Sequence, residues 1–138
     1  MPDIRYATRE DREFVGQDGY LPVDVLIRKI DDNEVVVADE AGVPLGYARI
    51  EFLWSRLPYI TLIRVRHDRR RQGVGRALLE FIEKELNGRG YNLLLSSSQS
   101  NEQEPQQWHI HMGFGECGRL RGLNDDGSEE VFFRKELR

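Results

Sequence analysis

Several features that define large classes of protein are absent from this 138-residue sequence. Its single cysteine, Cys117, excludes an internal disulfide and suits a reducing compartment. The first five residues, Met-Pro-Asp-Ile-Arg, lack the apolar segment of a secretory signal. No uncharged apolar run approaches the ~20 residues that span a bilayer. We therefore expect a cytoplasmic protein with no membrane partner.

Two common phosphate-binding motifs are also missing. The P-loop requires Gly-Lys-Ser/Thr, which occurs nowhere in the chain. The dinucleotide fingerprint requires a third glycine where this chain has Leu78. A formal net charge of −4 argues against a general nucleic-acid binder, whose surface is usually basic.

What is present is typical of one ordinary globular domain. The length is near the common domain size and is long enough to bury a core, so we expect a single domain over residues 1–138. A hydrophobic content of 39% with 32% charged residues favours a packed fold over a disordered chain.

The most informative stretch runs from Leu62 to Gly90. It reads as an apolar strand, a basic loop, the glycines Gly73 and Gly75, and an amphipathic helix. Asn87 and Gly88 predict a left-handed end to that helix. The apolar residues from Val74 onward recur at helical spacing, and the approach to the helix carries Arg64, Arg66, Arg69, Arg70 and Arg71.

This arrangement predicts an anion site at the start of the helix. The first turn of a helix leaves N–H groups without partners, and the helix dipole favours negative charge there. Glycines at 73 and 75 remove the Cβ atoms that would keep a phosphate away, and nearby arginines supply forked hydrogen bonds. An arginine run by itself is more often a solvated loop or a nucleic-acid patch. The glycine pair reverses that preference.

The other predicted elements surround this stretch. We expect two helices between the first and second strands, and one more between the strand 91–96 and the last two strands. The predicted strands are 4–7, 34–39, 45–54, 59–65, 91–96, 114–123 and 130–137, and the predicted helices are a short one from Thr8 to about Gly16, one from Pro22 to Ile30, and one from Pro105 to Met112.

Two segments of the chain resemble the GNAT-type N-acetyltransferase superfamily. Residues 70–75, Arg-Arg-Gln-Gly-Val-Gly, fit its Arg/Gln-x-x-Gly-x-Gly/Ala signature, and residues 108–114, Trp-His-Ile-His-Met-Gly-Phe, are similar to its aromatic-Tyr-x-x-x-Gly-Phe segment. The resemblance implies an α/β fold. It would have a mixed, mostly antiparallel sheet of six to seven strands, helices on both faces, and a splay between the fourth and fifth strands.

The resemblance also implies acetyl-CoA as co-substrate and the residues that hold it. Its pyrophosphate would lie on the N–H groups of the helix start, with one or more of the loop arginines, and its pantetheine arm would run along the preceding strand. The implied binding residues are Ile63, Arg64, Val65, Arg70, Arg71, Gln72, Gly73, Val74, Gly75 and Arg76.

The implied reaction is direct attack of a primary amine on the thioester in a ternary complex. A main-chain N–H near Val65 would stabilise the oxyanion. His109 stands where the family usually has a tyrosine acid, and it either protonates the thiolate or only packs on its helix. Some relatives carry a glutamate where this chain has Tyr59. Glu51 is the nearest carboxylate, and either it acts as base or a water relay suffices.

Other functions compete with this one. A zinc site at His109, His111 and Cys117 is rejected, because histidines two apart on a helix point to different faces and no fourth ligand is evident. A non-catalytic acyl-CoA sensor is the main alternative, and a nucleic-acid module built on the arginine loop is the second. The expected partners are a small-molecule or peptide amine and a second copy in a homodimer, with no nucleic acid, no membrane and no metal.

Overall fold

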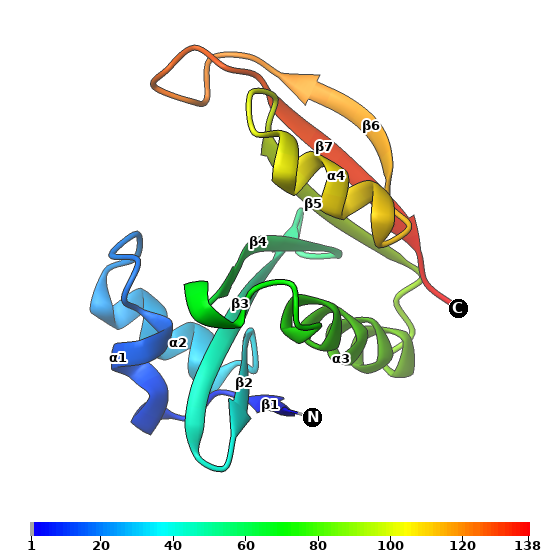
Figure 1. Cartoon of the computed structure of the whole chain (residues 1–138). Coiled ribbons are helices and arrows are strands. Elements are labelled where there is room, and N and C mark those ends of the chain that lie inside the picture. Colours follow the sequence, from blue (N-terminus) through cyan, green and yellow to red (C-terminus); the bar gives the residue numbers. More distant parts are fainter. Residues whose placement is uncertain (1) are drawn as a thin grey trace.

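The computed structural model describes residues 2–138, so residue 1, the first of the expected domain 1–138, lies outside the described residues. Seven strands form one sheet in the order β1-β2-β3-β4-β5-β7-β6 (Figure 1). In chain order the elements are β1 (Asp3–Tyr6), the 3₁₀ helix η1 (Arg9–Asp11), α1 (Arg12–Val15), α2 (Val23–Asp31), β2 (Val35–Glu40), β3 (Val43–Leu53), β4 (Leu57–Val65), the 3₁₀ helix η2 (His67–Arg69), α3 (Val74–Gly88), β5 (Leu93–Gln99), α4 (Gln103–His111), β6 (Gly115–Leu120) and β7 (Glu130–Glu136).

The sheet is mixed and mostly antiparallel, as predicted. Among the described residues 2–138, only β4 and β5 pair in parallel, across the crossover helix α3. The other neighbours are antiparallel. A parallel pair needs a long connection, and α3 supplies it.

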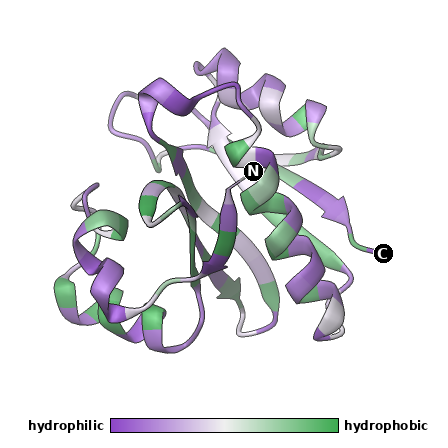
Figure 2. Cartoon of the chain, turned by 60° about the horizontal axis from the view of Figure 1, so that its bottom comes forward, coloured by the Kyte–Doolittle hydropathy of each residue, from purple (hydrophilic) through white to green (hydrophobic). Residues whose placement is uncertain are grey.

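Helices cover both faces of this sheet, which confirms the expected layering (Figure 1). On one face α1 and α2 pack over Val35, Val37 and Tyr47 of the first strands. On the other face α3 and α4 pack over the alternate residues, Val36 and Ala38 among them. The helices carry both hydrophobic and hydrophilic residues along their length, as amphipathic elements between core and solvent do (Figure 2).

Helix α3 is the longest helix, and its buried stripe follows the predicted spacing. Five of its apolar side chains are buried against the sheet: Val74, Leu78, Leu79, Ile82 and Leu86. The predicted helix end at Asn87-Gly88 is confirmed, but the predicted left-handed residue is wrong by two positions. The helix continues through Gly88, and the left-handed residue is Gly90, with φ of +92°. Glycine adopts this conformation without a Cβ clash, so the chain reverses there.

The later strands also differ from their predicted bounds. Strand β5 begins at Leu93 and extends to Gln99, because its polar end pairs with β7 in register through Gln99 and Glu130. Backbone pairing of this kind does not depend on side-chain polarity, which is why hydropathy missed it. Strand β6 ends at Leu120, three residues early.

Among residues 2–138, no helix is both long enough and apolar enough to cross a membrane.

Candidate active site

The centre of the candidate site is the point where β4 and β5 separate. Their pairing is limited to Tyr59 with Leu95 and Ile60 with Ser96. Next to that point β4 carries one extra residue, because Arg49 of β3 faces Leu62 while the adjacent Ile50 faces Ile60. Such a bulge bends and twists the strand.

Beyond Ile60, β4 keeps its partner on only one side. Residues 62–65 pair with β3, and no pairing with β5 is present there in the described chain. The edge of Ile63, Arg64 and Val65 that faces β5 is therefore open to an extended ligand arm, as β-augmentation requires.

At the end of β4 the chain enters the glycine turn at the start of α3. The first residue whose N–H closes the helical pattern is Ala77, which donates to the carbonyl of Gly73 at 3.0 Å. Within residues 2–138, the N–H groups of Gln72 to Arg76 donate to no backbone carbonyl. Free donors at a helix start attract an anion.

Glycine at position 73 keeps these donors accessible. Gly73 has φ of +85°, and a Cβ built on it would meet nothing within 4 Å. The chain itself therefore leaves the space above this residue open. Arg71, with φ of +63°, also lies in the left-handed region, so the turn is wound by two such residues.

The arginines of this loop divide into paired and free side chains. Arg66 binds Asp68 at 2.7 Å, and Arg69 binds Glu40 at 2.8 Å. The side chain of Arg64 lies elsewhere, with its guanidinium carbon 5.9 Å from the ring centre of Tyr20.

Three further arginines remain exposed at the turn: Arg70, Arg71 and Arg76. Only Arg71 has a carboxylate within 4.0 Å, that of Glu104, and both side chains are largely exposed. An exposed pair at that distance is weak. These three guanidinium groups are the ones available to phosphate oxygens.

Trp108 of α4 lies beside the glycine turn, which sequence reasoning did not anticipate. A Cβ at Gly75 would lie 3.6 Å from Nε1 of Trp108, an ordinary van der Waals distance, so the indole ring lies against this residue. The aromatic residue that opens the segment 108–114 was the signal available in the sequence.

His109 is buried, with 4% of its surface exposed, and both ring nitrogens are engaged. Nδ1 is 2.8 Å from the carbonyl oxygen of Pro105, and Nε2 is 2.7 Å from Oγ of Ser96. A carbonyl only accepts, so Nδ1 carries the proton and Nε2 accepts from the Ser96 hydroxyl. The ring also stacks on Phe133 at 4.4 Å.

This environment favours neutral imidazole. Burial lowers the pKa of His109 to about 4, although the Pro105 carbonyl acts in the opposite direction. In the neutral form, Nε2 has no proton to give toward β5.

Glu51 lies on the opposite face of the sheet from His109. It faces Tyr59 in the β3–β4 register, its side chain is 49% exposed, and one carboxylate oxygen is 4.0 Å from Nζ of Lys29. The two predicted catalytic side chains are therefore on opposite sides of the splay.

A second set of polar side chains, from β4, β5 and β7, lies on the Glu51 face of the sheet. It crosses the point where β4 and β5 begin to separate, which we call the mouth of the splay. The hydroxyl of Tyr59 is 2.6 Å from Oγ of Ser97, which in turn donates to Glu130 of β7 at 2.6 Å. Burial raises the pKa of Tyr59. Sequence reasoning named Tyr59 only as the residue where some relatives carry a glutamate. It missed Glu130, because the β5–β7 pairing is what brings the end of the chain here.

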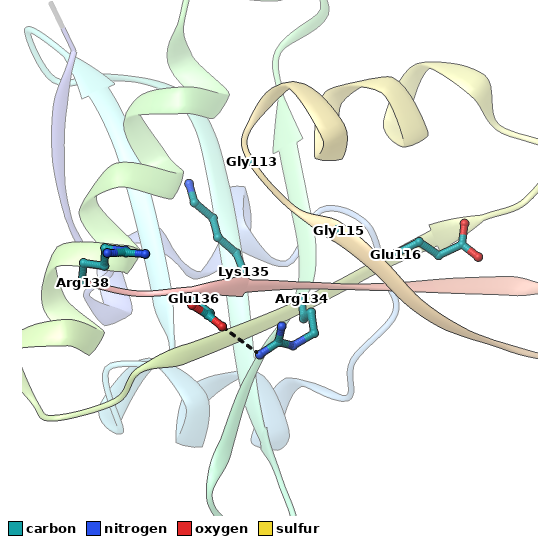
Figure 3. A pocket seen from close by; sticks show the side chains of 7 residues that line it. All are labelled: Gly113, Gly115, Glu116, Arg134, Lys135, Glu136 and Arg138. Atoms are coloured by element: carbon teal, nitrogen blue, oxygen red, sulfur yellow. Dashed lines mark ion pairs between the residues drawn. The ribbon is translucent and has the colours of Figure 1, made fainter.

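A separate shallow hollow lies at the outer end of the sheet, away from these residues (Figure 3). Lys135 points toward one side of β7, and Arg134 and Glu136 point toward the other, where they are 3.7 Å apart. None of the predicted site residues lines this hollow. The described residues 2–138 hold no cluster of three potential metal ligands.

Comparison with known proteins gives one consistent result. The sequence model of the Acetyltransferase (GNAT) family matches residues 1–114. No curated protein matches the chain in sequence.

Several solved structures share the fold. Ard1 from Thermoplasma volcanium has a TM-score of 0.87 at 18% identity, with 99% of this chain and 98% of that chain covered. The structure of yncA from Salmonella typhimurium, solved with its cofactor acetyl-CoA, has a TM-score of 0.81 at 19% identity and covers 100% and 95%. A ribosomal-protein-alanine N-acetyltransferase from Brucella melitensis has a TM-score of 0.77 at 22% identity and covers 97% and 99%. At such identities the likeness concerns the fold.

Proposed function

Because the chain belongs to the GNAT family of acetyltransferases, we propose that it moves the acetyl group of acetyl-CoA to a primary amine. The acceptor attacks directly, in a complex that holds both substrates. A small molecule and a peptide both remain open as acceptors. The expected cytoplasmic location and homodimer stay predictions.

One observation carries the proposal. The unpartnered N–H groups of Gln72 to Arg76 adjoin the open space at Gly73, and both lie at the end of a strand whose edge is free. A pyrophosphate needs free N–H groups with open space beside them, and an extended pantetheine arm needs a free strand edge. Acetyl-CoA has both groups in one molecule, so the residues present fit it.

Each part of the site then has a role in binding. Arg70, Arg71 and Arg76 supply charge to the phosphates, and the edge of Ile63 to Val65 aligns the pantetheine arm. Bound acetyl-CoA supplies an activated acetyl group. A main-chain N–H near Val65 is the proposed donor to the oxyanion, where a fixed dipole costs no reorganisation.

Proton transfer would use the two faces of the splay. On the face of α1 and α2, Glu51 is the carboxylate that the sequence offers as base for the amine. His109, on the face of α4, is the proposed acid for the thiolate, and its contacts set a condition: Nε2 must first take up a proton. Imidazolium is scarce at neutral pH when the pKa is about 4.

That condition favours a second function, an acyl-CoA sensor without turnover. A neutral His109 held between Ser96 and Pro105 serves packing as well as it serves catalysis. The sensor and the enzyme share the same coenzyme seat and differ only in turnover.

Two measurements on the purified chain test the proposal. Isothermal calorimetry with CoA and acetyl-CoA reports binding, and chromatography of free CoA reports transfer to spermidine, lysine, neomycin or an alanine-initiated peptide. Binding with amine-dependent CoA release supports the transferase. Binding without release supports the sensor, and absence of binding excludes both.

A further inference from the structure

Tyr59, Ser97 and Glu130 form a continuous hydrogen-bonded row across the mouth of the splay. Glu130 accepts from the Ser97 hydroxyl at 2.6 Å, which uses the only proton of that hydroxyl. The Tyr59 hydroxyl, 2.6 Å from Oγ of Ser97, must therefore be the donor in that contact. The direction of the row is thus set from Tyr59 toward Glu130.

Each member is held in place by a different element. The ring of Tyr59 stacks on Phe132 of β7, with ring centres 5.7 Å apart. The second carboxylate oxygen of Glu130 accepts from Nδ2 of Asn124 at 3.1 Å, which leaves the first to face Ser97. Ser97 is the first residue of β5 beyond the last one paired with β4.

The row lies on the face of the sheet away from the coenzyme helix. Ile60 and Phe133 pack in the core with α3 and α4, so their neighbours Tyr59 and Phe132 point the other way. The charged groups that act on Tyr59 are Glu130 of β7 and Glu51 of β3.

We propose that Tyr59 and Ser97 relay the proton of the acceptor amine to Glu130, which is the terminal proton acceptor. This inference rests on the proposed function, and it replaces Glu51 in the role of base. Glu130 is partly exposed at the start of β7, so it can pass the proton on to solvent.

The step balances as follows. A bond forms between the amine nitrogen and the acetyl carbon, the bond from that carbon to sulfur breaks, and sulfur keeps the electron pair. The nitrogen proton passes to Oη of Tyr59, the Tyr59 proton to Oγ of Ser97, and the Ser97 proton to the Glu130 carboxylate. Loss of that proton to solvent and rotation of the two hydroxyls restore the row.

The first test measures the row in the protein without ligand. Tyrosine labelled with ¹³C at Cζ allows titration of Tyr59 by NMR, with its signal assigned from the Tyr59→Phe spectrum. Glu130→Gln should shift the titration to lower pH, because a negative charge is lost. In a Ser97→Ala background this shift should shrink. An equal shift in both backgrounds overturns the relay.

The second test measures transfer. With an amine that the wild type acetylates, Tyr59→Phe, Ser97→Ala and Glu130→Gln should each lower kcat/KM for the amine by about 100-fold, within the range of general-base effects. The double variant Tyr59→Phe/Glu130→Gln should lose little more than either single one. Ser97→Thr should restore the rate, because it restores the hydroxyl.

Matched variants separate the outcomes. Glu136→Gln, on the same strand but exposed and paired with Arg134, should keep the wild-type rate. A full rate in Glu130→Gln with a loss in Glu51→Gln overturns the relay and leaves the transferase standing. If the wild type binds CoA but acetylates no amine, the proposed function fails, and the catalytic use of the row fails with it.

Discussion

Arg49 in the middle of β3 holds Asp18, in the loop between α1 and α2, through two hydrogen bonds of 2.7 and 3.0 Å. Both side chains are buried, 4% and 1% exposed. Tyr47 also donates to Asp18, at 2.7 Å, and Arg49 donates to the carbonyl of Val15 at 3.0 Å. This buried ion pair therefore holds the segment of α1 and α2 against the face of the sheet that it covers.

Removal of the Asp18 charge should destabilise the fold. Asp18→Asn leaves the Arg49 guanidinium buried without its counter-charge, which costs roughly 3 kcal/mol or more of the free energy of unfolding. Urea denaturation at pH 7 measures this loss. A change below about 0.5 kcal/mol would contradict the central role of the pair.

The same pair predicts how stability depends on acid. Burial acts to raise the pKa of Asp18, but hydrogen bonds from Arg49 and Tyr47 outweigh it and hold the pKa well below its ordinary value. A depressed folded pKa contributes stability above the unfolded pKa of about 4, and this contribution is lost as pH falls further. Wild type and Asp18→Asn should thus converge in stability below pH 4.

A side chain at position 73 should weaken CoA binding while the fold survives. In Gly73→Val the new Cβ has no protein atom within 4 Å, and the side chain occupies space beside the N–H groups. We expect at least a 30-fold rise in the Kd for CoA by calorimetry. Gly90→Val is the control, since Gly90 has φ of +92° and equally open space. Similar affinity in both variants would show that the seat lies elsewhere.

The buried histidine should make the fold sensitive to mild acid. The folded pKa of His109 is about 4 and its unfolded pKa about 6.5, so below pH 6.5 the unfolded chain binds more protons. The free energy of unfolding should therefore fall by about 3 kcal/mol between pH 6.5 and pH 4. His109→Gln removes the titrating group, and its unfolding free energy should vary less over that interval.

The same variant separates the two roles of His109 in turnover. If the ring is the acid, His109→Gln should lower kcat strongly with little change in the Kd for CoA, and the wild-type rate should fall as pH rises above 5. Equal kcat in wild type and variant across that range would assign His109 to packing and to the position of Ser96.

Trp108 should report coenzyme binding by fluorescence. It lies against Gly75 at the seat, whereas the other tryptophan, Trp54, is 78% exposed on the β3–β4 turn. CoA should change the emission of the wild type and leave that of Trp108→Phe unchanged. A response that persists in Trp108→Phe and disappears in Trp54→Phe would contradict this placement.

Local patterns were sufficient for much of the fold. The apolar period of α3 and its start after the basic loop depend on neighbours within one or two turns of chain, so residue spacing predicts them. The left-handed residue after α3 was misplaced because both Gly88 and Gly90 can adopt that conformation. Which of them does so depends on the packing of Leu86 and Tyr91 at the sheet.

The sequence by itself determined the strand-turn-helix of the proposed anion seat, because its donors, its glycines and its arginines are contiguous. Only the tertiary structure decided which arginines are free, that His109 is enclosed by Ser96 and Pro105, and that Glu130 reaches Tyr59 through Ser97. These contacts join residues far apart in the chain through the register of β5 with β7. Hydropathy and spacing carry no information about such register, since it arises from the whole sheet.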